Sequence, residues 1–262
     1  KKLVGPVHKI FRGTDIGLVE GPHLYKRDGY YYIFAAEGGT SYEHAISCGR
    51  SKSITGPYEI HPCNPLISSY GHDIEIQRAG HGAMCKSPDG KKDYLVYLCG
   101  RPFEGTRRCT LGRETGIAEL EWKDGWPFVK QPDGSLQNFP PEYIEVEGEG
   151  EVLPGYGVMH PAEKYTFDND DWKLDFKTLR IPMTEKRFST KERPGWLRIH
   201  GGQSPVSTFD QGLVARRQTD FNFEAETKLE FNPTNFQHMA GMVYRYDEQT
   251  QYLCVVTHDE QL

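Results

Sequence analysis

The sequence lacks the long apolar runs and the blocks of like charge that are typical of membrane and nucleic-acid-binding proteins. No stretch approaches the ~20 apolar residues that are needed to cross a bilayer. The 31 lysines and arginines stand against 37 aspartates and glutamates, so the net charge is −6, and neither sign gathers into a long block. These absences argue against a membrane or nucleic-acid partner and favour a neutral ligand.

The sequence also lacks the short motifs of several common catalytic sites. It contains no G-x-S-x-G nucleophile elbow, no G-x-x-x-x-G-K-[ST] phosphate loop, no G-x-G-x-x-G at the start of a helix and no H-E-x-x-H. Its six cysteines include no C-x-x-C pair and no histidine at zinc spacing. Among the catalytic chemistries considered, the one that remains is acid–base chemistry by carboxylate side chains. Buried free thiols suit a reducing compartment, which favours the cytoplasm over secretion.

Turn residues and aromatic residues are abundant. The chain has 28 glycines, 17 prolines and 15 tyrosines. Short runs of strand type, each bounded by turn residues, recur at 30–36, 44–50, 93–100 and 116–122. Helical periodicity is nearly absent. The pattern predicts an all-β protein, and by itself it leaves a sandwich, a barrel and propeller blades as alternatives.

A second series of strand-like segments begins after about residue 158. This change predicts a first domain over 1–158 and a second over 159–262. Apolar and polar residues alternate over 221–231, as expected of an antiparallel strand with one face on a core. Residues 238–259 read as a hairpin that turns at 247–250. The second domain is therefore predicted to be a β-sandwich.

Glu20 is the first candidate functional residue. It directly precedes a Gly-Pro-His segment and a run of strand-forming tyrosines. Because Pro22 biases Gly21 away from helix, Glu20 is expected on an extended or turn segment, where a β-scaffold holds a side chain rigidly. The residues alone leave two interpretations open. Glu20 is either a surface or structural carboxylate, or a proton donor at the mouth of a sheet.

Three further residues carry similar alternatives. His81 is flanked by Gly80 and Gly82, which permit a tight bend or a close approach of the backbone to a ligand. It is either a hydrogen-bonded core histidine or a partner for a sugar hydroxyl or water. Arg113 either binds vicinal hydroxyls in a bidentate manner or forms a plain salt bridge. Thr40 follows Glu-Gly-Gly and either faces a cleft or caps a turn.

Four segments in series carry a resemblance to a known family. Residues 20–68, 80–85, 111–129 and 195–231 resemble the β-xylosidases of glycoside hydrolase family 43, in the family's order. The resemblance implies a five-bladed β-propeller followed by a β-sandwich. It assigns the C-terminal part of the catalytic propeller to the first predicted domain and the N-terminal part of the sandwich to the second.

The resemblance also implies roles for the four candidates. Glu20 matches the family's general acid, while Thr40, His81 and Arg113 match residues that line its substrate pocket, Arg113 contacting sugar hydroxyls. The implied activity is that of an inverting, exo-acting β-D-xylosidase, which releases xylose from the non-reducing ends of xylo-oligosaccharides. Two alternatives stay open: α-L-arabinofuranosidase activity, alone or as a second specificity, and a non-catalytic carbohydrate-binding protein.

Two carboxylates of the family pattern have no match in the chain. The family's general base and a second aspartate that modulates the acid both belong well upstream of Glu20. Asp15 lies too close to Glu20 and lacks the expected Asp-Pro neighbourhood. The chain is therefore expected to be an internal piece of a longer enzyme that needs an N-terminal segment to complete its propeller. The resemblance further implies a homo-oligomer and no required cofactor, with room for a calcium ion near His81.

Overall fold

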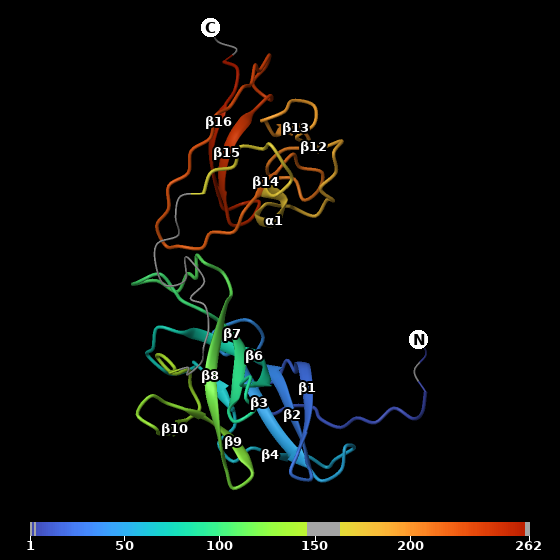
Figure 1. Cartoon of the computed structure of the whole chain (residues 1–262), viewed down its shortest axis with the longest axis vertical. Helices are drawn as coiled ribbons and strands as arrows, with labels where there is room; N and C mark the ends of the chain where they lie inside the picture. The colour runs from blue at the N-terminus through green and yellow to red at the C-terminus, as the bar shows by residue number, and fades with distance from the viewer. Residues whose placement is uncertain (1, 3, 146–162, 260–262) are drawn as a thin grey trace. The chain divides into compact units, whose positions relative to one another are not determined.

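The structure is a computed structural model that describes residues 2, 4–145 and 163–259. It divides into two compact units, 1–150 and 151–262. The predicted boundary between residues 158 and 159 lies outside the described residues. Nearly all regular structure in the described part is β-strand, as the sequence predicts, and the helix α1 (Trp172–Asp175) is one turn long (Figure 1). No helix in this part is long and apolar enough to cross a membrane.

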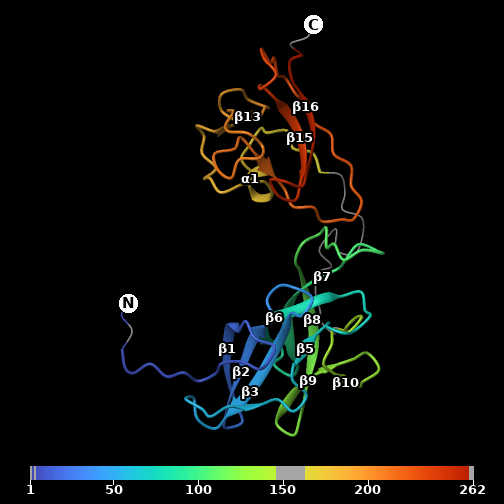
Figure 2. The same cartoon turned by 180° about the vertical axis from the view of Figure 1, so that it is seen from behind.

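The first unit contains two antiparallel sheets of five strands each. In the first sheet β1, β2, β3 and β4 follow one another in chain order, and β5 pairs with β3 (Figure 2). In the second sheet β6, β7, β8, β9 and β10 also follow chain order. The strand bounds are β1(Glu20–Arg27), β2(Tyr30–Glu37), β3(Ala45–Ser51), β4(Glu59–Ile60), β5(Ile67–Ser68), β6(Gln77–Lys86), β7(Asp93–Gly100), β8(Glu114–Lys123), β9(Trp126–Lys130) and β10(Leu136–Gln137).

Two Asp-Gly turns set the register of the hairpins. Asp28 and Gly29 connect β1 to β2 with φ of 48° and 79°, and Asp124 and Gly125 connect β8 to β9 with φ of 53° and 71°. Positive φ at both central residues matches the right-handed twist of the flanking strands, and Asp-Gly adopts it at low cost. The turn signals in the sequence are thus confirmed at both places.

The core of the first unit lies between its two sheets, where β6 packs on β2 and β3. The side chains of Phe34 and Ile46 from the first sheet are fully buried, as are those of Leu95 and Val129 from the second. Successive antiparallel meanders that pack face to face are the arrangement of neighbouring propeller blades. The strand period of two is visible in this core, since alternate residues of β2, β3, β7 and β8 contribute to it.

A buried ion-pair cluster fastens the two sheets together. Asp93 on β7 is only 5% exposed, and its carboxylate accepts hydrogen bonds from Arg27 on β1, from Lys86 Nζ at 3.0 Å and from Trp122 Nε1 at 2.8 Å. The Arg27 guanidinium also stacks 4.2 Å from the centre of the Trp122 ring. Burial acts to raise the pKa of Asp93, but these hydrogen bonds outweigh it and hold the pKa below its ordinary value.

A buried histidine makes a second connection between the sheets. His61 follows β4 and is 3% exposed. Its Nδ1 accepts a hydrogen bond from the backbone N–H of Cys63 at 3.0 Å, so Nε2 carries the proton that it donates to the Pro127 carbonyl at 2.8 Å. The ring also packs edge-on against Trp126 and Phe128. Burial lowers the pKa of His61 to about 4, which keeps the ring neutral.

The second unit has shorter strands. The hairpin predicted over 238–259 is present, with its turn at 247–250. The strand pairs are β11(Lys177–Thr178) with β14(Val214–Ala215), β12(Phe188–Ser189) with β13(Arg198–Ile199), and β15(Ala240–Arg245) with β16(Gln251–Val256).

The strand predicted over 221–231 is absent from the structure. These residues form no ladder, and Phe223 and Leu229 are 54% and 41% exposed. An alternating segment forms a strand only when a neighbour accepts its backbone hydrogen bonds and its apolar face is covered. Among the described residues β15 and β16 pair only with each other, so residues 221–231 have no neighbouring strand. The exposure of Phe223 and Leu229 shows that the apolar face is not covered either. The prediction of a core-facing strand is therefore wrong here.

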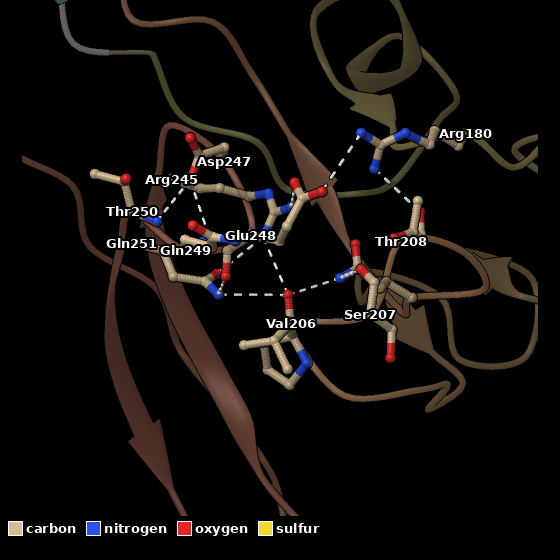
Figure 3. A network of polar contacts seen from close by, with 12 residues as sticks. Arg180, Val206, Ser207, Thr208, Arg245, Asp247, Glu248, Gln249, Thr250 and Gln251 are labelled. Atoms are coloured by element: carbon tan, nitrogen blue, oxygen red, sulfur yellow. Dashed lines mark hydrogen bonds and ion pairs between the residues drawn. The ribbon is translucent and has the colours of Figure 1, made fainter.

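A polar network fixes the β15–β16 hairpin to the loop between β13 and β14 (Figure 3). The carbonyl of Pro205 accepts hydrogen bonds from Gln211 Nε2 at 2.7 Å, Arg245 Nη1 at 3.1 Å and Gln251 Nε2 at 3.4 Å. Arg180 donates to the Thr208 carbonyl at 3.1 Å. Side-chain donors thus hold a loop against a hairpin where no sheet ladder joins them.

We expect Asp93→Asn to lower the free energy of unfolding by roughly 1.5–3 kcal/mol at neutral pH, because it removes the charge from a buried, hydrogen-bonded cluster. The folded pKa lies below the ordinary 3.8, so the stabilisation is present above that value and is lost as the pH falls through the folded pKa. Urea unfolding of both proteins from pH 7 to pH 3 measures this difference.

The matched control is Asp28→Asn. Asp28 also contacts Arg27, at 3.3 Å, but its side chain is 85% exposed. Exposed ion pairs contribute little, and asparagine tolerates the left-handed backbone of this turn. Equal destabilisation by the two substitutions would contradict the role assigned to Asp93.

His61 predicts a second pH effect. Its pKa is about 4 in the folded chain and 6.5 ordinarily, so the unfolded chain binds more protons between these values. Stability should therefore fall as the pH drops from about 6.5 towards 4. In His61→Gln this part of the pH dependence should be missing, and in the exposed control His72→Gln it should remain. A slope unchanged in His61→Gln would refute the assignment.

Candidate active site

Glu20 begins β1 at a point where the strand is irregular. It pairs with Ala36, and the register then gains one residue on β1 before His23 pairs with Phe34. Gly21, in this bulge, has a φ of 53°. Bulges re-aim side chains at sheet edges and beside active sites. The Glu20 side chain is 56% exposed, so its carboxylate is accessible to a ligand.

His81 lies in a matching irregularity of β6. Gly80 pairs with Leu98 and Gly82 with the next residue, Tyr97, so His81 is the extra residue of a bulge. Its φ is 45°, in the left-handed region. The side chain is 35% exposed, and Nδ1 lies 4.0 Å from Oε1 of Glu20. The structure thus brings two of the four predicted site residues together, and His81 is not a core histidine.

The contact between the two bulges depends on a glycine. A Cβ atom built on Gly21 would lie 2.3 Å from Nε2 of His81 and 2.6 Å from its Cε1. Real Cβ atoms do not approach a ring so closely, and the positive φ at Gly21 is also unfavourable for other residues. The His81 ring therefore lies directly against the backbone that follows Glu20.

Thr40 and Arg113 lie at the same ends of their sheets as Glu20 and His81. Thr40 is exposed in the turn after β2, whose last residues pair with the start of β1. None of the hydrogen bonds formed by the described residues joins it to Glu20 or His81. Arg113 is exposed directly before β8. The neighbouring Glu114 forms its salt bridge with Arg101 instead, at 2.7 Å. Within the described part of the chain Arg113 forms no salt bridge, which argues against the interpretation of Arg113 as a plain salt-bridge residue.

Sequence reasoning missed Glu37, a buried carboxylate beside the site. Glu37 ends β2 and has no exposed surface. It accepts hydrogen bonds from the Thr14 backbone N–H at 2.6 Å, from Thr14 Oγ1 at 2.7 Å and from Ser47 Oγ. The next residue, Gly38, donates its N–H to the Gly17 carbonyl at 2.8 Å. Glu37 thereby fixes the segment that leads into Glu20. The only sequence signal was a carboxylate at the end of an apolar run.

His44 was also missed, because a single histidine before a strand is an ordinary feature of a sequence. It is 2% exposed, and burial lowers its pKa, against the opposing effect of a hydrogen bond to the Arg78 carbonyl. The charges of His81 and Arg113 lower the pKa further, and that of Glu20 raises it. Each of these three side chains is therefore within electrostatic reach of His44.

The site has the chemistry of proton transfer to a neutral ligand. The accessible carboxylate of Glu20 lies beside the imidazole of His81, and the guanidinium of Arg113 forms no ion pair with any of the described residues. The described residues contain no group of three or more histidine, cysteine, aspartate or glutamate side chains that could hold a metal ion. Calcium takes six to eight oxygen ligands. The calcium ion that the resemblance allows near His81 stays a prediction from the sequence.

The paired antiparallel sheets and the second unit of short strands define a nearly all-β protein of two units, with an accessible carboxylate at a bulged strand end. Residues 1–127 match the family "Glycosyl hydrolases family 43", and residues 164–262 match "Beta xylosidase C-terminal Concanavalin A-like domain". The chain belongs to glycoside hydrolase family 43. The resemblance drawn from the sequence is confirmed, and so is the fold of part of a propeller followed by a sandwich domain.

Individual relatives support this assignment. The chain is 44% identical to "Xylosidase/arabinosidase 43B" of Humicola insolens, over 99% of this chain and 46% of the relative. It is 42% identical to "Beta-xylosidase" of Bacillus subtilis (strain 168), over 100% of this chain and 49% of the relative. The crystal structure of xylan beta-1,4-xylosidase from Bacillus halodurans C-125 matches with 46% identity and a TM-score of 0.85, over 98% of this chain and 48% of that one. The chain spans about half the length of the curated relatives it matches.

We expect Gly21→Ala to displace the His81 ring, because the new methyl group would overlap it. Gly29→Ala is the matched control, since Gly29 also has a positive φ, of 79°, but has nothing within 4 Å of a built Cβ. Both substitutions should destabilise the chain by about 1–2 kcal/mol through backbone strain. Only Gly21→Ala should shift the imidazole NMR signals of His81. Unshifted signals in that variant would contradict the contact.

Proposed function

We propose that the complete protein containing this chain is an inverting, exo-acting β-D-xylosidase that releases xylose from the non-reducing ends of xylo-oligosaccharides. The observation that carries the proposal is the accessible Glu20 carboxylate, held at a bulge beside His81 in a chain of family 43. The relatives named as β-xylosidases support the choice of sugar.

Glu20 acts as the general acid in this proposal. Its carboxyl group protonates the glycosidic oxygen as the bond to the anomeric carbon breaks, so the leaving sugar departs as a neutral alcohol. A second carboxylate takes a proton from water that attacks the opposite face of the sugar. In inverting enzymes the two carboxyl groups lie ~6.5–9.5 Å apart, which leaves room for that water. We assign the second carboxylate to the part of the complete protein outside this chain, in line with the greater length of the relatives.

The other three predicted residues bind the sugar. Arg113 has no acidic partner among the described residues, so its planar guanidinium is available for two adjacent hydroxyls. His81 offers a ring nitrogen next to the acid, and the exposed Thr40 offers a hydroxyl at the end of β2. A homo-oligomeric state and a cytoplasmic location stay predictions from the sequence.

A second candidate activity is that of an α-L-arabinofuranosidase, alone or beside the first. It is favoured by the 44% identity to a relative whose name includes both sugars. Pentose hydroxyls are similar in the two substrates, so pocket shape decides between them. Comparison of kcat/KM on the aryl β-D-xyloside and the aryl α-L-arabinofuranoside separates the two activities.

We expect Glu20→Gln, in the complete protein, to reduce kcat for xylobiose by about 10²–10⁴-fold, because proton donation to a poor leaving group is lost. An aryl xyloside with an acidic leaving group needs less protonation and should lose less activity. Initial rates on both substrates measure the difference.

The control is Glu121→Gln, which removes an exposed carboxylate on β8 and should leave both rates unchanged. Equal loss on the two substrates in Glu20→Gln would refute the role as acid. Binding of xylobiose by the complete wild-type protein without turnover would instead favour the non-catalytic carbohydrate-binding alternative.

A further inference from the structure

The bulged start of β6 holds two non-glycine residues in the left-handed region. Arg78 has a φ of 56° and His81 a φ of 45°. Such a backbone conformation is strained for a non-glycine residue and persists only where the surroundings enforce it. The register shifts between Gln77 and Gly80 and between Gly80 and Gly82 bracket these two residues. Some neighbouring group must therefore hold the bulge that directs His81.

The buried imidazole of His44 lies against this bulge. Its Nδ1 lies 3.0 Å from the carbonyl oxygen of Arg78. A carbonyl only accepts, so Nδ1 carries the proton and donates it. A Cβ built on Gly80 would lie 2.4 Å from Cγ of His44, so the ring lies flush against the bulge. His44 is itself fixed, because Ser68 Oγ donates to its carbonyl at 2.8 Å.

The second ring nitrogen of His44, Nε2, indicates that the residue does more than fill space in the core. Nε2 is buried and has no hydrogen-bond partner within the described residues. A buried polar atom without a hydrogen-bond partner destabilises the folded chain. An apolar side chain would avoid that cost and fill the same space, but it would give up the bond to Arg78. Three of the four predicted site residues, His81, Arg113 and Glu20, act electrostatically on the ring.

We propose that His44 is a positioning residue of the candidate active site, which sets the His81 ring beside Glu20 by holding the Arg78 carbonyl and the bulge of β6. The inference rests on the proposed function only for its kinetic consequences. Neither ring nitrogen of His44 contacts the substrate in this account. Its effect passes through the backbone of residues 78–81.

Three substitutions in the complete protein test the proposal. In His44→Asn the side-chain amide N–H replaces Nδ1–H, so the bond to Arg78 is kept. His44→Gln places its amide where Nε2 lies, and His44→Phe fills the space without a donor. We expect His44→Asn to retain kcat on xylobiose close to wild type, and the other two to lose about 10- to 100-fold, as displaced active-site groups do.

A double-mutant cycle with His81→Ala separates positioning from general stability. If His44 acts through His81, His44→Phe should add no further kinetic loss to His81→Ala, because the two losses share one cause. Additive losses would overturn the proposal. So would a kcat per folded molecule that is unchanged in His44→Phe while its melting temperature falls, or activity that survives in His44→Gln and not in His44→Asn.

A readout without turnover keeps this test separate from the proposed function. The imidazole NMR signals of His81 should move in His44→Phe and His44→Gln and stay in place in His44→Asn. If the wild-type protein hydrolyses no xyloside and these shifts occur, the proposed activity fails and the positioning role stands. Unmoved His81 signals in all three variants would overturn the positioning role itself.

Discussion

The close approach of β6 to the first sheet is the constraint on which the candidate active site depends. At Gly21 the backbone leaves no room for a Cβ beside the His81 ring, and at Gly80 it leaves none beside the His44 ring. Gly82 is also confined, since a Cβ there would lie 2.8 Å from Cδ1 of Ile46 on β3 of the first sheet. Without side chains at these three positions the two sheets meet closely enough for Glu20 and His81 to come within 4.0 Å.

Polar groups around this contact fall into two kinds. The buried ones, such as Glu37, His61 and Asp93, form hydrogen bonds that connect segments or sheets to each other. Glu20 and Arg113 are exposed instead. The difference is physical, because an ionised group is tolerated inside the protein only when it is fully paired. A group kept available for a ligand must stay at the surface, and a rigid surrounding then fixes its direction. His44 combines the two kinds, with one nitrogen bonded and the other without a partner in the described part of the chain.

The all-β class, the Asp-Gly hairpins of the first unit and the β15–β16 hairpin were predictable, because each depends on residues close together in sequence. The strand predicted over 221–231 fails for the complementary reason. Its alternation is correct as a pattern, but a strand also needs a partner and a covering layer, and the described residues provide neither. The family resemblance predicted that Glu20 and His81 belong to one site, which spacing alone did not, and the structure places the two side chains 4.0 Å apart.

The sequence by itself determined the strand periods, the turns and the residue types available for chemistry, since these are local properties with a reach of a few residues. Only the tertiary structure decided that His81 faces Glu20, that His44 lies beneath Gly80 and that Arg113 has no acidic partner in the described part. Each of these depends on the packing of two sheets and on single-residue bulges in β1 and β6. A bulge shifts every later side chain by one residue relative to its partner strand, and an alternating sequence carries no mark of where that happens.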